Sequence, residues 1–138
     1  MKLSFGEYMI SKDKALLQLE TIHRFLSSSY WANQRTMEKV EASIQNSICY
    51  GVYHHAKQIG FARVITDGAT LYYLCDVIID EDYRGQGIGK KLVEVIVHSE
   101  ELRGLTGVLG TQDAHGLYEP FGFIRDQNRF MRRPLDLC

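Results

Sequence analysis

The middle of the chain combines glycines and cations in a pattern suited to holding an anion. Gly85, Gly87 and Gly89 alternate shortly after an apolar run that ends in the acidic residues 80–82, with Arg84 before them and Lys90 after them. Glycines let the backbone approach a ligand closely, and a helix that starts here would present unpaired N–H groups and the positive end of its dipole. This chemistry favours a phosphate or pyrophosphate group.

Three known phosphate-binding patterns contain glycines at a similar spacing to those of this stretch. A Walker A loop needs four residues between its first glycine and the Gly-Lys pair, whereas residues 85–89 enclose three. A dinucleotide fingerprint would need glycine at Lys90. Only the pattern Arg/Gln-x-x-Gly-x-Gly/Ala is met in full, by Arg84, Gly87 and Gly89. A purely structural glycine turn is the remaining alternative.

A second motif lies about 30 residues downstream, where residues 111–123 read TQDAHGLYEPFGF. Together the two motifs resemble the GNAT superfamily, the Gcn5-related N-acetyltransferases, whose second signature is typically Asn-x-x-Ala-x-x-Leu-Tyr-x-x-x-Gly-Phe. Every position agrees except the first, where Thr111 replaces the common asparagine. The order of elements agrees along nearly the whole chain.

The resemblance implies acetyl-CoA as co-substrate, with its pyrophosphate held by backbone amides and its pantetheine arm alongside a splayed strand at residues 74–79. It places the cofactor contacts on three segments. These are the strand residues Val77, Ile78 and Ile79, the loop and helix start at Arg84, Gly85, Gln86, Gly87, Ile88, Gly89 and Lys90, and the downstream pair Thr111 and Tyr118.

The resemblance also implies catalytic roles. Tyr118 matches the family tyrosine that donates a proton to the departing sulfur, although a packing role is the alternative. Backbone N–H groups near Val77 are placed to polarise the thioester carbonyl. Asp76 is a candidate general base; its alternatives are a structural hydrogen bonder or an anchor for a cationic substrate. His115 or solvent is the other candidate for the base.

The acceptor is expected to be a primary amine on a small molecule or peptide. Tyr30 and Trp31 are candidates for an aromatic wall of the acceptor groove, or for a loop anchor in the core. A non-catalytic sensor of acetyl-CoA on the same fold is the alternative function. No metal is expected, because His54 and His55 would point in opposite directions along a strand.

Hydrophobic periodicity and turn signals predict the elements that position these residues. Asp13 is expected to cap a first helix that extends through Leu26, and a hairpin turn is expected at residues 67–68. Further helices are predicted around residues 37–44, after the glycine-rich turn with Leu92, Val93, Ile96 and Val97 on one face, and after an Asp113 cap. Strands are predicted at residues 48–53, 58–66, 70–79, 108–111, 123–124 and 130–131. This order of elements predicts a mixed α/β (α+β) fold class. The resemblance implies one GNAT-like domain over residues 1–138, with a mostly antiparallel sheet flanked by helices and a V-shaped split at the central strand.

Composition excludes several classes of protein. The 138 residues carry 16 basic and 17 acidic side chains, so no basic nucleic-acid footprint is present. No apolar run approaches the 20 or so residues that a membrane helix needs. Cys49, Cys75 and Cys138 form no metal-binding pair and are expected to be reduced, which with the absence of a secretory signal favours the cytoplasm. A monomer or homodimer is expected.

Overall fold

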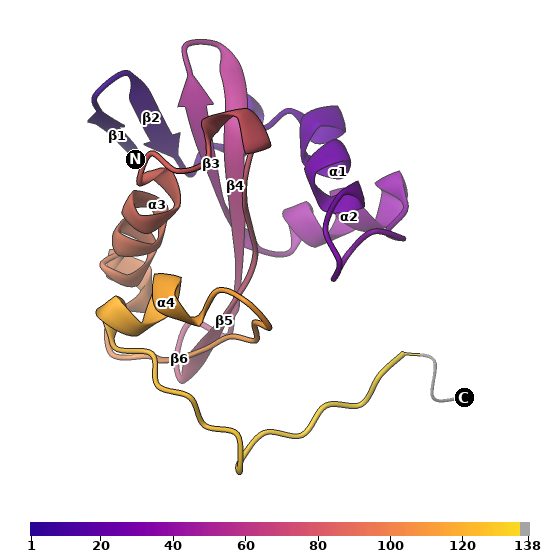
Figure 1. Cartoon of the computed structure of the whole chain (residues 1–138), viewed down its shortest axis with the longest axis vertical. Coiled ribbons are helices and arrows are strands. Elements are labelled where there is room, and N and C mark those ends of the chain that lie inside the picture. The colour runs from indigo at the N-terminus through magenta and orange to yellow at the C-terminus, as the bar shows by residue number, and fades with distance from the viewer. Residues whose placement is uncertain (136–138) are drawn as a thin grey trace.

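One six-stranded sheet organises the chain in this computed structural model, which describes residues 1–135 (Figure 1). Its strands are ordered as in the sequence, β1 to β6, and every neighbouring pair is antiparallel except β5 and β6, which are parallel. The strands are β1 (Lys2–Phe5), β2 (Tyr8–Ser11), β3 (Ile48–His54), β4 (Lys57–Thr66), β5 (Leu71–Ile79) and β6 (Thr106–Val108).

Helices cover both faces of this sheet (Figure 1). They are α1 (Leu19–Ser27), α2 (Met37–Gln45), α3 (Ile88–Val97) and α4 (His115–Tyr118). The helices α1 and α2 bury Ile22, Phe25 and Val40 in a core on one face. The helices α3 and α4 contribute to a larger core on the other face. The mixed α/β architecture with a mostly antiparallel sheet is thus confirmed.

Local sequence explains why α3 lies where it does. Its residues Ile88, Leu92 and Ile96 recur at four-residue spacing and are at most 2% exposed. This spacing places them on one helical face, which packs against the sheet. The glycine-rich segment therefore enters a helix whose position is fixed by burial of this face.

The N-terminal part differs from expectation in two ways. Asp13 caps only a single 3₁₀ turn at Lys14–Leu16, by accepting a hydrogen bond from the Ala15 N–H, and α1 begins at Leu19. The first eleven residues form a hairpin, β1–β2, that the sequence analysis did not predict. Its outer strand β1 does alternate polar and apolar residues, but the run is only four residues long and almost wholly exposed, and of its residues only Phe5 is of a type enriched in strands.

The C-terminal part also differs. The predicted strand at residues 108–111 forms earlier, as β6, and the predicted closing strands at residues 123–124 and 130–131 are wrong. From Phe123 to residue 135 the described chain has no helix or strand. Ile124 is 83% exposed and Met131 is 95% exposed, because these apolar side chains find no sheet or helix to pack against.

The prediction that His54 and His55 point in opposite directions is wrong as well. The strand β3 ends at His54, and His55 takes a left-handed backbone conformation with φ of 55°. The alternation of side chains along a strand therefore stops between them, and their ring centroids lie 4.5 Å apart.

Truncation of the buried helical face should destabilise the protein. We expect Leu92→Ala, at a fully buried position, to lower the free energy of unfolding by about 2–5 kcal/mol through lost burial and a cavity. Leu71→Ala is the matched control, because that side chain is 45% exposed at the start of β5 and should cost about 0.5 kcal/mol or less. Urea unfolding measures both. Equal losses would contradict the assignment of α3 as the core helix.

Candidate active site

The strand β5 carries a β-bulge at the centre of the candidate site. On its β4 side, Cys75 pairs with Arg63 and Ile78 pairs with Phe61, so two residues of β5 stand opposite Ala62 alone. One of them, Asp76, adopts a left-handed φ of 55°. Such a bulge leaves backbone groups out of the ladder and reverses which side chains face each side of the sheet.

The core confirms this reversal. Before the bulge, Tyr72 and Leu74 contribute to the core under α3; after it, Val77 and Ile79 pack against that same core, and Ile78 faces the α1–α2 core. The bulge therefore shifts the alternation by one residue.

The other edge of β5 is also unpaired over most of its length. Its parallel pairing with β6 joins Leu71–Tyr73 to Thr106–Val108 and then ends. Over the described residues, β5 from Leu74 to Ile79 has no ladder partner on that side. Residues 76 and 77 therefore have no partner in the strand register on either side of β5. The sheet splits here as expected. The strand β5 lies next to the edge of the sheet, however, and not at its centre.

The glycine-rich loop begins at the end of this split. Gly85 and Gly87 both have φ of 80°, a conformation that L side chains rarely adopt, and a Cβ atom at either would meet no protein atom within 4 Å. Gly87 is the N-cap of α3 and offers no capping side chain. Arg84 folds back, with its Nε donating to the Ile79 carbonyl at 3.0 Å. The loop is an open cradle of backbone N–H groups, which fits a pyrophosphate.

Tyr118 and Thr111 lie at the opposite end of the split, where both line a cavity of about 770 Å³ together with His115. Burial raises the pKa of Tyr118 to about 12, with smaller contributions from Tyr30 and Asp113. The phenol therefore keeps its proton at neutral pH. The hydroxyl oxygen of Thr111 accepts a hydrogen bond from the Ala114 N–H at 3.0 Å, so Thr111, and not the predicted Asp113, closes the turn into α4.

The loop after α1 brings two exposed aromatic residues to the split. Tyr30 is 49% exposed and Trp31 is 42% exposed. Their rings pack edge to face, with the ring centroids 5.1 Å apart. The Tyr30 hydroxyl accepts a hydrogen bond from the Gln112 N–H, whereas the Trp31 Nε1–H donates to Asp76 Oδ1 at 3.2 Å. The pair thus connects the loop before α4 with the bulge of β5, and its exposure argues against a core anchor.

Asp76 is buried, and both of its carboxylate oxygens accept hydrogen bonds from other side chains. Its Oδ2 accepts hydrogen bonds from Arg63 Nε at 2.9 Å and Arg35 Nη1 at 2.7 Å, while its Oδ1 accepts from Trp31. Its side chain is 1% exposed. A carboxylate held by two guanidinium groups and an indole is poorly placed to accept a proton from a substrate. These contacts favour the structural alternative for Asp76 over the catalytic one.

Two of these partners were not predicted from the sequence. Arg63 interrupts the apolar run of β4, and a charge within a buried strand was a signal that it needs a buried partner. Arg35 lies in a polar loop and gave no such signal, because only folding brings it to Asp76, 41 residues away.

Known proteins match this chain along most of its length. The family described as the acetyltransferase (GNAT) domain matches residues 45–125, which include the bulge, the glycine loop and Tyr118. The chain belongs to the GNAT acetyltransferase family.

Relatives agree with this assignment. A crystal structure from Xanthomonas campestris, described as an acetyltransferase of the GNAT family, is 36% identical, with a TM-score of 0.89 and 96% of each chain covered. An acetyltransferase of Gibberella zeae, FG08082, is 32% identical over 72% of this chain and 66% of its own length. A protein of Pyropia yezoensis named as the N-acetyltransferase ycf52 is 26% identical over 91% of this chain and 75% of its own length.

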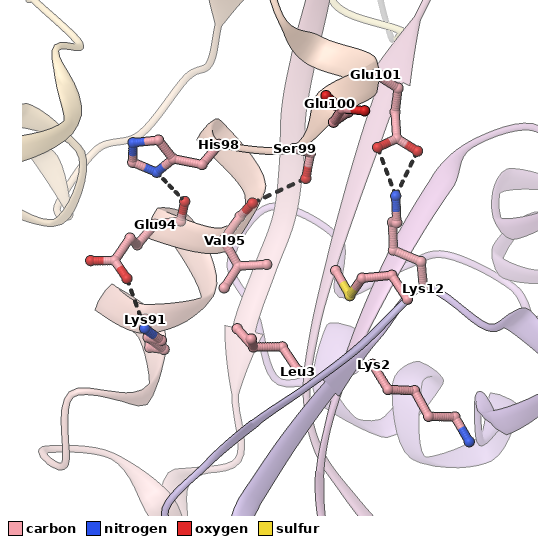
Figure 2. Close-up of a pocket in the computed structure, with 11 residues that line it drawn as sticks. Lys2, Leu3, Lys12, Lys91, Glu94, Val95, His98, Ser99, Glu100 and Glu101 are labelled. Atoms are coloured by element: carbon pink, nitrogen blue, oxygen red, sulfur yellow. Dashed lines mark hydrogen bonds and ion pairs between the residues drawn. The ribbon is translucent and has the colours of Figure 1, made fainter.

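A second hollow lies away from the GNAT motifs, between the β1–β2 hairpin and the outer side of α3 (Figure 2). Four of its charged side chains form two ion pairs: Lys12 Nζ contacts both carboxylate oxygens of Glu101 at 2.6 Å, and Lys91 pairs with Glu94 at 2.8 Å. None of the predicted site residues lines it. The split beside β5 is therefore the candidate active site of this GNAT domain. Among residues 1–135, none of the helices combines the length and apolar character needed to span a bilayer.

Removal of the Asp76 carboxylate should destabilise the fold. We expect Asp76→Ala to lower the free energy of unfolding by about 3–5 kcal/mol, because Arg63 would remain buried without its anion. Asp126→Ala is the control, since it removes an exposed pair with Arg129 and should cost about 1 kcal/mol or less. Denaturant unfolding measures both. If Asp76→Ala left the free energy of unfolding unchanged, the structural role of Asp76 would be contradicted, and Asp76 would again be a candidate general base.

Proposed function

We propose that this chain transfers the acetyl group of acetyl-CoA directly to a primary amine of a small molecule or peptide, with both substrates bound at once. The observation that carries the proposal is the unpaired backbone of β5 at the bulge, which lies between a glycine cradle at one end and a protonated tyrosine at the other.

The cradle accounts for binding of the co-substrate. The N–H groups of the loop from Gly85 to Gly87 and of the first turn of α3, at Ile88, Gly89 and Lys90, would hold the pyrophosphate, whereas the Arg84 N–H donates to the Glu81 carbonyl. The free edge of β5 at Val77 and Ile79, flanking Ile78, would pair with the amides of the pantetheine arm, and the Thr111 hydroxyl still has its own hydrogen to donate. Acetyl-CoA itself supplies an activated acyl group.

Two groups of the chain would assist the chemical step. Backbone N–H groups near Val77 would stabilise the carbonyl oxygen as negative charge develops on it when the amine adds. The Tyr118 phenol would give its proton to the sulfur as the carbon–sulfur bond breaks, and the excess proton of the amine would leave through water or His115. Asp76 would instead hold the bulge and the acceptor loop in place.

The cysteines support direct transfer over a covalent enzyme intermediate. Burial raises the pKa of the Cys75 thiol to about 11, and the neighbouring Asp76 carboxylate adds to this shift. Burial likewise raises the pKa of Cys49 to about 11. Both thiols therefore stay protonated at neutral pH, whereas the thiolate is the nucleophile. Cys138 lies outside the described residues.

The exposed aromatic pair supports an amine acceptor. Indole and phenol faces attract ammonium groups, and Trp31 and Tyr30 present such faces beside the split. An acceptor amine that binds as its ammonium form and loses its proton to solvent would fit this wall.

Two glycine-to-alanine substitutions that introduce similar backbone strain, one in the loop and one outside it, test the cradle. We expect Gly87→Ala to weaken acetyl-CoA binding at least tenfold in calorimetric titration, because the added methyl group occupies the open face of the loop. Gly68→Ala is the control: Gly68 has φ of 73° in the β4–β5 turn, so its strain is matched, but binding should be unchanged. ATP and NAD should not bind. A wild-type protein that binds no acetyl-CoA would overturn the proposed function.

The role of Tyr118 is tested by removal of its hydroxyl. We expect Tyr118→Phe to lower kcat about tenfold or more with unchanged affinity for acetyl-CoA, in an assay against a panel of amines. Because the pKa of Tyr118 is raised to about 12, the wild-type rate should not fall between pH 7 and 9.5 through its deprotonation.

The control for this substitution is Tyr53→Phe, which removes a buried hydroxyl that has no hydrogen-bond partner. Its kcat should match that of the wild type. Equal rates for Tyr118→Phe and the wild type would remove Tyr118 from the mechanism. Binding of acetyl-CoA with no turnover on any amine would favour the sensor alternative.

A further inference from the structure

Two hairpin turns meet at the end of the sheet that lies nearest the glycine loop. Pairing of Tyr8 with His54 places Glu7, in the β1–β2 turn, against the end of β3. One potential ligand atom each from Glu7, His54 and His55 lies within 4.8 Å of the others. The Glu7 Oε1 and His54 Nε2 atoms are 3.9 Å apart.

The ring of His54 is oriented as a metal ligand would be. Its Nδ1 lies 3.0 Å from the Tyr83 hydroxyl. Its Nε2 is buried, has no hydrogen-bond partner and faces Glu7. When Nδ1–H donates to Tyr83, the lone pair of Nε2 is directed at the cluster. Metal-bound histidines commonly have such a partner on the second ring nitrogen, which fixes the tautomer.

His55 supplies the second imidazole through an unusual backbone. Its left-handed φ of 55° brings its ring next to that of His54, tilted by 32°. Non-glycine residues adopt this conformation at a cost, and such strain is often found at functional sites. His55 and Glu7 are both exposed, so the cluster is open to ions in solution.

We propose that Glu7, His54 and His55 bind one divalent transition-metal ion of the zinc type, with water completing its coordination. Two imidazoles and a carboxylate are a donor set that Zn²⁺ accepts, whereas Mg²⁺ and Ca²⁺ prefer oxygen ligands throughout. Donor atoms around tetrahedral zinc lie about 3.3 Å apart, given zinc–ligand distances of about 2 Å. The Glu7 side chain is 76% exposed and free to move closer.

The ion would clamp the two turns beside the glycine loop. His54 contacts Tyr83, which precedes Arg84, and the hydroxyl of Tyr8, next to Glu7, donates to Gln86 Oε1 at 2.7 Å. The site lies outside the proposed catalytic machinery and stands on its own geometry, so it holds or fails independently of acetyl transfer.

Calorimetric titration with Zn²⁺ alone tests the proposal, on untagged full-length protein first treated with a chelator. We expect one Zn²⁺ per chain with a micromolar or tighter Kd, no binding of Mg²⁺, and a higher Tm with Zn²⁺, because the ion binds the folded state. Glu7→Gln and His55→Ala should each weaken Zn²⁺ binding at least tenfold and abolish the Tm shift.

His98→Ala is the matched control, because His98 is an exposed histidine at the end of α3 and should not affect Zn²⁺ binding. Both cluster variants change exposed turn residues, and their Tm without metal reports whether they fold. Absence of stoichiometric Zn²⁺ binding to the wild type would overturn the proposal. So would binding that both cluster variants retain at wild-type affinity.

Discussion

The buried ion pair between Asp76 and Arg63 is the interaction on which the candidate site depends. It holds a bulge whose left-handed residue departs from ordinary strand geometry, and it does so from a neighbouring strand, β4, that is buried from Gln58 to Val64. A buried pair of this kind adds little net stability compared with an apolar pair, but it strongly disfavours any arrangement that separates the charges. Its value here lies in specifying one geometry for β5.

That geometry has consequences on both faces of the sheet. Because the bulge shifts side-chain alternation by one residue, Leu74 and Val77 both pack toward α3, and the backbone between them is left without partners. On the opposite face, Arg35 and Trp31 bind the same carboxylate and draw the loop after α1 over the split. One carboxylate therefore joins the cofactor strand to the proposed acceptor wall.

Burial also sets the chemistry that this site can perform. The raised pKa of Tyr118 keeps a proton available, and the raised pKa of Cys75 keeps its thiol from acting as a nucleophile. Both shifts arise mainly because a charged form is poorly solvated inside the protein. The same environment therefore keeps the Tyr118 phenol and the Cys75 thiol in their neutral forms at neutral pH.

The fold class and the position of the anion cradle were predictable from the sequence, because both depend on local signals. Apolar periodicity marked α3 and the three long strands, and alternating glycines with flanking cations marked the loop at Gly85 and Gly87. The β1–β2 hairpin was missed because its outer strand is an exposed run of only four residues, too short for its alternation to indicate a strand. The expected closing strands at residues 123–124 and 130–131 failed because a short apolar run does not determine whether a partner strand is within reach.

The sequence by itself determined that the loop around Gly85 and Gly87 has the residue types to bind a pyrophosphate, since this follows from spacing within one segment, whereas the role expected of Tyr118 followed from the family resemblance. Only the tertiary structure decided what Asp76 does, because its partners Arg35 and Arg63 come from a loop and a strand that are distant in sequence. It also decided that His54 and His55 lie together, because one left-handed backbone angle ends the alternation of the strand. Charge pairing and backbone angles of this kind depend on contacts that no local pattern records.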